Sequence, residues 1–198
     1  MLNIQPFNST ASQHHQQRGH NVSVFLQPIY TQTVGSSGAA SITFNNIPQT
    51  FTDLKVIISG RSARNTGSAT DNLNVAFNST PTVSTTILDS GSPYGSPRSF
   101  RTSYVFGELD SANDTANTFG SLEMYIPNYT SSNYKSSISD YIAENNSGTG
   151  DYLVSVGMRA SLIQLSSGIT SITFTTGTGS NFLQYSTFSL YGVLRQGV

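Results

Sequence analysis

The sequence predicts an all-β domain, an antiparallel sandwich or barrel built from about ten strands. Apolar residues recur at every second position in one segment after another, which is the spacing of a strand with one buried face. Charged residues make up only 10% of the chain, against roughly 25% in an average soluble domain. Ser, Thr, Asn and Gly take their place and favour turns and strands, while the usual surface helix formers are scarce.

Alternation locates the individual strands. Residues 24–34 are expected to form an edge strand, because Pro28 lacks the backbone donor that a central strand needs. Residues 54–60 are expected near the middle of a sheet, since Ile57 is apolar like its neighbours and predicts a strand covered on both faces. Further strands are expected over 40–45, 72–78, 100–109, 119–126, 134–143, 152–158, 169–174 and 182–194, with a loop region rich in Ser, Thr, Pro and Gly over 79–98.

One tetrapeptide, Ser-Ile-Thr-Phe, occurs twice, at residues 41–44 and 171–174. Both copies precede a turn. The match marks either two equivalent strands or a coincidence in a chain rich in Ser and Thr, and no repeat of fixed period accompanies it.

The chain is expected to divide into an extended N-terminal arm, residues 1–21, and a β-sandwich domain, residues 22–198. Residues 9–21 have no apolar periodicity, which is typical of a segment that is disordered or becomes ordered only on a partner. The arm has no apolar signal core, and no run approaches the roughly 18 apolar residues of a membrane-spanning helix. The net charge of −1 gives no electrostatic reason to bind nucleic acid or a membrane, and the absence of cysteine excludes disulfides.

The residues of common catalytic sites are missing or badly placed. All three histidines, His14, His15 and His20, lie in the arm, so a Ser-His-Asp arrangement is not expected, and a weak metal site there is less favoured than a polar arm. Glu108 and Glu123 could face each other as a carboxylate pair, although two solvent-side strand residues are the favoured interpretation. The loop 110–114 could hold Ca²⁺ but fits no standard ligand spacing. The sequence therefore predicts no enzyme, no cofactor and no metal.

Arginine and loop aromatics are the best candidates for contacts with a partner protein. Arginine supplies seven of the nine basic residues, and its planar guanidinium suits protein interfaces better than lysine does. Ordinary surface ion pairs, and aromatics that close the ends of the core, are the alternatives. The candidate partner-binding residues are Arg18, Arg61, Arg64, Arg98, Arg101, Tyr94, Tyr129 and Tyr134.

Three segments resemble small structural proteins of tailed bacteriophages, notably marine and cyanobacterial ones. They are ASITFNNIPQTFTDLKVIISG at 40–60, LEMYIPNYTSSNYKS at 122–136 and ITSITFTTGTGSNFLQYSTFSLYGV at 169–193. The resemblance covers much of residues 30–193 and leaves out the arm and residues 79–98. The resemblance implies a virion protein with a jelly-roll-like sandwich. It indicates the fold and the class of protein, and it identifies no functional site.

The leading hypothesis is a capsid decoration, or cement, protein that binds the major capsid protein lattice on the outer surface of the virion. It would be made in the host cytoplasm and would bind other copies of itself, as a homotrimer. The arm would become ordered on neighbouring subunits. The alternative is a tail-fibre or receptor-binding module whose loop aromatics contact host glycans. A cellular carbohydrate-binding module is a third possibility.

Overall fold

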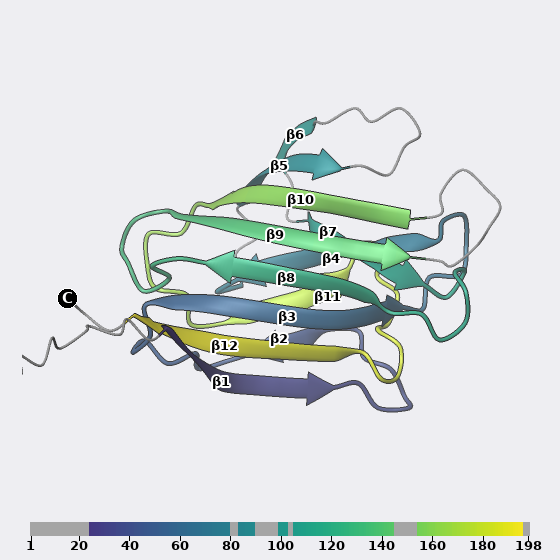
Figure 1. Cartoon of the computed structure of the whole chain (residues 1–198), viewed down its shortest axis with the longest axis horizontal. Helices are drawn as coiled ribbons and strands as arrows, with labels where there is room; N and C mark the ends of the chain where they lie inside the picture. The colour runs from purple at the N-terminus through teal and green to yellow at the C-terminus, as the bar shows by residue number, and fades with distance from the viewer. Residues whose placement is uncertain (1–23, 80–82, 90–98, 103–104, 145–153, 196–198) are drawn as a thin grey trace, which may run out of the picture.

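A computed structural model describes residues 24–79, 83–89, 99–102, 105–144 and 154–195 (Figure 1). Within these residues the chain forms twelve strands and no helix, so there is also no helix with the length and apolar character that a membrane crossing requires. The strands are β1 (Val24–Thr33), β2 (Ile42–Phe44), β3 (Asp53–Ser62), β4 (Thr70–Phe77), β5 (Val83–Asp89), β6 (Ser99–Thr102), β7 (Val105–Ser111), β8 (Gly120–Ile126), β9 (Lys135–Glu144), β10 (Val154–Ile163), β11 (Ile172–Thr176) and β12 (Thr187–Arg195).

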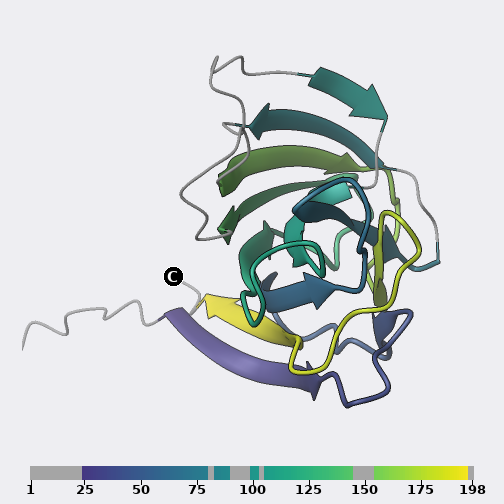
Figure 2. The ribbon, with the colours of Figure 1, turned by 90° about the vertical axis from the view of Figure 1, so that its right-hand side faces the viewer.

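The strands form two layers joined at one end. The large sheet has the order β1-β12-β3-β8-β9-β10-β5-β6, and the small sheet has the order β2-β11-β4-β7, with every neighbouring pair antiparallel. The last residues of β3, Arg61 and Ser62, pair in parallel with Asp110 and Ser111 of β7 and connect the layers. Figure 1 shows the small sheet behind the large one, and Figure 2 shows β5 and β6 projecting beyond it.

Eight of the strands pair in a nested order. The first pairs with the last and the second with the second to last, giving β1 with β12, β2 with β11, β3 with β8 and β4 with β7. Two hairpins, β5–β6 and β9–β10, are inserted into this scheme and widen the large sheet. The predicted all-β class is therefore confirmed, and the nested order is compatible with a jelly-roll-like sandwich.

Aromatic side chains fill the space between the layers. Phe174 on the small sheet contacts Phe188 on the large sheet, with their ring centroids 5.4 Å apart. Phe188 also packs edge-to-face on Phe182, and Phe174 on Phe44. All four side chains are buried, and such ring pairs add to the stabilisation that burial gives.

Two expectations about individual strands are confirmed. β1 is an edge strand that pairs only with β12 among the described residues, and its register shifts between Pro28 and Tyr30. β3 lies inside the large sheet, between β12 and β8, although only one of its faces is covered, because Lys55 and Ile57 are partly exposed and Ser59 is exposed. The N-terminal arm proposed for residues 1–21 lies outside the described residues.

Several boundaries were predicted wrongly, and β10 for example extends to Ile163 rather than ending at residue 158. The single strand expected over 100–109 is two strands, β6 and β7, which belong to different sheets. The last strand begins at Thr187 rather than at residue 182, because Phe182 forms isolated bridges to Ala39 and Ser62 and Tyr185 has a positive φ of 72°. The loop region 79–98 contains β5, which extends the large sheet beside β10.

Candidate functional site

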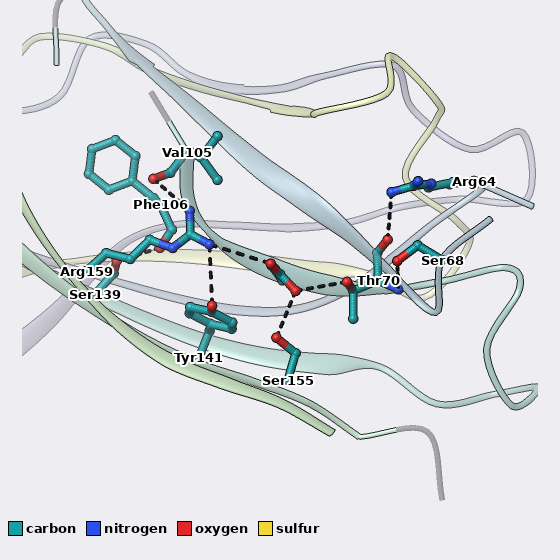
Figure 3. Close-up of polar contacts among 10 residues, drawn as sticks. Arg64, Ser68, Thr70, Val105, Phe106, Ser139, Tyr141, Ser155 and Arg159 are labelled. Atoms are coloured by element: carbon teal, nitrogen blue, oxygen red, sulfur yellow. Dashed lines mark hydrogen bonds and ion pairs between the residues drawn. The ribbon is translucent and has the colours of Figure 1, made fainter. Parts of the chain in front are cut away.

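A polar network lies between the two layers where the β9–β10 hairpin covers β7 (Figure 3). It is called the interlayer network here and consists of Thr70, Glu108, Tyr141, Ser155 and Arg159. The alternation of β10 turns Ser155 and Arg159 toward the small sheet, and Tyr141 lies on the buried side of β9.

The Glu108 carboxylate is the centre of this network. Its Oε2 atom accepts hydrogen bonds from the hydroxyls of Thr70 and Ser155, both at 2.8 Å. Its Oε1 atom lies 3.7 Å from Nη2 of Arg159. Because hydroxyls and a cation surround the carboxylate, its charge is compensated within the chain.

Arg159 supplies the cation and is only 2% exposed. Its Nη1 donates to the carbonyl oxygen of Val105 at 3.3 Å, and its Nη2 donates weakly to the Tyr141 hydroxyl at 3.4 Å. The guanidinium carbon lies 5.1 Å from the centroid of the Tyr141 ring, within the range of a cation–π contact. The network therefore acts as a polar clamp between β10 and β7.

The structure does not bring Glu108 and Glu123 together. Glu123 lies on the opposite side of the large sheet, where Lys55 Nζ approaches its Oε2 at 2.8 Å. Glu108 faces the space between the layers. The two carboxylates cannot act as the acid and base of a glycosidase in this arrangement.

The loop that follows β7 is built around Arg61 rather than around a metal ion. The Arg61 guanidinium donates to the carbonyl oxygens of Asp114 at 2.9 Å, Thr115 at 2.6 Å and Thr118 at 2.8 Å. These oxygens would otherwise be candidate ligands for Ca²⁺. Across the described residues no cluster of three or more His, Asp and Glu side chains is arranged to hold a metal.

Burial changes the protonation of the acids beside Arg61. Desolvation raises the pKa of Asp110 to about 6, with Asp114 and Glu144 adding to the rise. The nearby Thr118 hydroxyl and the charge of Arg61 act in the opposite direction. Desolvation also raises the pKa of Asp114 above its ordinary value. Asp110 is 1% exposed, so its carboxyl group is the main buried acid of this region.

Lys135 is a further buried cation, beside Arg159 and Arg61, and is 2% exposed. Its Nζ donates to the carbonyl oxygens of Ser131 at 2.7 Å, Leu165 at 2.8 Å and also Ser167. These three bonds use all three hydrogens of the ammonium group and tie two loops to the start of β9. Desolvation lowers the pKa of Lys135 below its ordinary value.

The candidate partner-binding residues have different surroundings. Arg61 and Tyr129 are buried, and the Tyr129 hydroxyl donates to the carbonyl oxygen of Pro48, so both side chains serve the packing of the chain itself. Arg64 donates to the carbonyl oxygens of Thr66 and Thr70. Tyr134 is 59% exposed and accessible to a partner. Arg18, Tyr94 and Arg98 lie outside the described residues, as does the side chain of Arg101 on β6.

The site that sequence reasoning missed is the side of the β9–β10 hairpin that faces away from the small sheet. It is called the outer face here. Five large apolar side chains are between 38% and 45% exposed on it, namely Ile138, Ile142, Val156, Met158 and Leu162. The opposite side of the same hairpin, toward the small sheet, carries the polar residues Ser137, Ser139, Arg159 and Ser161 beside the buried Tyr141, Ala143 and Ile163. The usual pattern of a sandwich, apolar inside and polar outside, is thus partly inverted in this hairpin.

Comparisons of the chain with models of protein families, with curated proteins and with solved structures gave no match.

Proposed function

We propose that this chain is a non-enzymatic structural protein of a virus particle, a decoration or cement protein that binds the major capsid protein lattice. The observation that carries the proposal is the partly inverted pattern of the β9–β10 hairpin, which leaves five large apolar side chains on the surface for contacts with the capsid or with further copies of the chain. Exposed apolar patches on a folded domain are typical of surfaces that contact other proteins.

The other features of the chain agree with a contact role. The charged groups inside the domain, Glu108, Arg159, Arg61 and Lys135, are held by the chain's own hydroxyls, carbonyls and ion pairs. These charged groups stabilise the β-fold, and none of them forms an acid–base or nucleophile–base pair with another. The nested strand order and the three segments quoted above support the assignment to phage structural proteins with a jelly-roll-like sandwich.

The proposed partners are the major capsid protein and further copies of this chain, arranged as a homotrimer on the outer surface of the capsid. A closed ring of copies multiplies contacts that are weak one by one. Neither nucleic acid nor a membrane is a proposed partner, because the net charge is only −1.

Co-sedimentation with particles that lack this protein tests the proposal. The purified full chain should bind heads saturably and raise the temperature at which they lose their DNA. Tyr134→Ala should weaken binding, while Tyr185→Ala, at another exposed loop tyrosine, serves as the matched control.

The alternative, a tail-fibre or receptor-binding module, is favoured by these same two tyrosines, which are 59% and 67% exposed. Exposed aromatic rings can stack on sugars. Binding on a glycan array, with none to heads, would support this alternative and contradict the decoration role.

A further inference from the structure

The outer face combines apolar side chains with an excess of negative charge. Ile142 lies directly opposite Val156 in the pairing of β9 with β10, and Ile138 lies opposite Ala160. In the neighbouring pair of strands, Glu123 of β8 lies directly opposite Asp140 of β9 on the same side of the sheet. Like charges directly opposite each other destabilise a sheet, so this pair calls for a cation nearby.

The chain supplies only part of that compensation. Lys55 reaches Glu123 at 2.8 Å from the neighbouring strand β3. One lysine against the two carboxylates of this pair leaves one negative charge beside the exposed apolar side chains of Met158 and Ile138. An occupant that fits this face has apolar side chains and at least one positive charge.

The same face of a second copy does not meet this requirement. Two outer faces pressed together about a twofold axis would bring the Glu123 and Asp140 pairs of both copies into one apolar contact. Desolvating several like charges together costs more than the apolar contact contributes.

The segment before β1 has the required chemistry. Residues 1–23 contain no Asp or Glu, and the first acidic residue of the chain is Asp53. They carry Arg18 and three histidines, together with the apolar Leu2, Ile4 and Phe7. We propose that residues 1–23 of one copy dock on the outer face of a second copy, with Arg18 close to Asp140.

The length of the segment allows this exchange. An extended chain of 23 residues reaches about 75 Å, whereas β9 lies four strands from β1, about 19 Å across the sheet. To reach the outer face of its own copy, the segment would have to cross β12, β3 and β8, whose outward residues there include the polar Ser59, Lys55 and Ser189 together with Ile57 and Tyr191. A segment that docks on the next copy makes a head-to-tail contact, and such contacts form a ring where the rotation between copies closes.

The inference deepens the proposed function by naming what covers the outer face in contacts between copies. This proposal depends on the proposed role of the chain in contacts between proteins, and it does not depend on binding to the capsid. Because self-association is measured in solution without particles, a failure here and a failure of capsid binding are distinguishable.

Sedimentation of the full chain over a range of concentrations gives the first test. We expect a closed oligomer with a mass that is a multiple of 21.2 kDa. Arg18→Glu, and separately Ile142→Ser with Met158→Ser, should weaken association at least tenfold, while Tyr185→Ser should leave it unchanged. The substituted outer-face residues point away from the core, and circular dichroism of each variant checks that the β-fold persists.

A charge exchange makes the test specific for the proposed contact. Asp140→Arg alone should weaken association, and Asp140→Arg combined with Arg18→Glu should restore most of it. The chain has no Trp, so Phe7→Trp places a single reporter whose emission should shift to the blue on association and stay red-shifted in the outer-face variant. A full chain that stays monomeric, an oligomer that survives the outer-face substitutions, or a double variant without rescue would each overturn the proposal.

Discussion

Arg159 on β10 and Glu108 on β7 form an ion pair across the two layers of the domain, with 3.7 Å between Nη2 and Oε1. The pair holds the β9–β10 hairpin against the small sheet by a polar contact, since the inward side of this hairpin is rich in serine. The hairpin is therefore free to present its apolar residues outward. The same ion pair therefore stabilises the fold and keeps the apolar side of the β9–β10 hairpin on the surface.

Replacing the cation should destabilise the domain. We expect Arg159→Met to lower the free energy of unfolding by about 3 kcal/mol, because the change leaves the Glu108 carboxylate without its cation. Denaturation in urea, followed by circular dichroism, measures the change. The double variant Arg159→Met with Glu108→Gln should regain part of the loss, and a single variant as stable as the parent would contradict the role of the clamp.

Lys135 should be equally sensitive. Lys135→Met keeps the length of the side chain but removes the donor to the carbonyls of Ser131 and Leu165. We expect a loss of about 3 kcal/mol, since buried acceptors without a donor carry their full desolvation penalty. Lys55→Met is the matched control. It breaks a partly exposed ion pair and should cost at most about 1 kcal/mol in the same urea titration.

The buried Asp110 should make stability depend on pH. Its pKa is about 6 in the folded chain, above the 3.8 of an exposed aspartate, so the folded state binds the proton more tightly. Stability should therefore fall as pH rises from about 4 to about 6 and stay lower above that range, by at most about 3 kcal/mol.

Asp110→Asn should raise the melting temperature at pH 7 and flatten its dependence on pH between 4 and 6. Thermal unfolding at half-unit pH steps measures both effects. A variant that is less stable than the parent at pH 7, with the same pH slope, would show that the Asp110 carboxylate is compensated better than its burial suggests.

Gly192 should not tolerate a side chain. A Cβ atom at this position of β12 would lie 2.3 Å from Cγ of Phe51, whose ring lies against the backbone there. We expect Gly192→Ala to cost about 2 kcal/mol, because the ring must move out of a packed position. Gly35→Ala is the matched control, since nothing lies within 4 Å of the added carbon, and urea midpoints of the two variants compare the costs directly.

The repeated tetrapeptide shows what a sequence pattern can predict and where it stops. The two copies of Ser-Ile-Thr-Phe form neighbouring strands, and β2 pairs with β11 in the register Ile172 to Phe44 and Phe174 to Ile42. The hydroxyls of Thr43 and Thr173 are 3.1 Å apart across this pair. The alternation of apolar residues predicted both segments as strands. It could not predict that β2 pairs with β11, because the paired residues are about 130 positions apart and local sequence carries no signal for such a pairing.

The outer face was missed for a related reason. Alternation along β10 indicates that Val156 and Met158 share one side of a strand, and it does not say which side the domain buries. That choice depends on the contacts of Arg159 with β7, which is far away in the sequence. In the same way, Arg61 was a candidate for partner contacts because its type suits interfaces, and only the fold places it inside a loop of its own chain.

Imaging of intact virus particles that carry this chain tests the central claim most directly, which is that the domain is a scaffold for contacts with other capsid proteins. We predict density for the β-sandwich at the junctions between major capsid subunits, on the outside of the head, in groups of three. Density for the chain confined to the tail, with none on the head, would contradict the account.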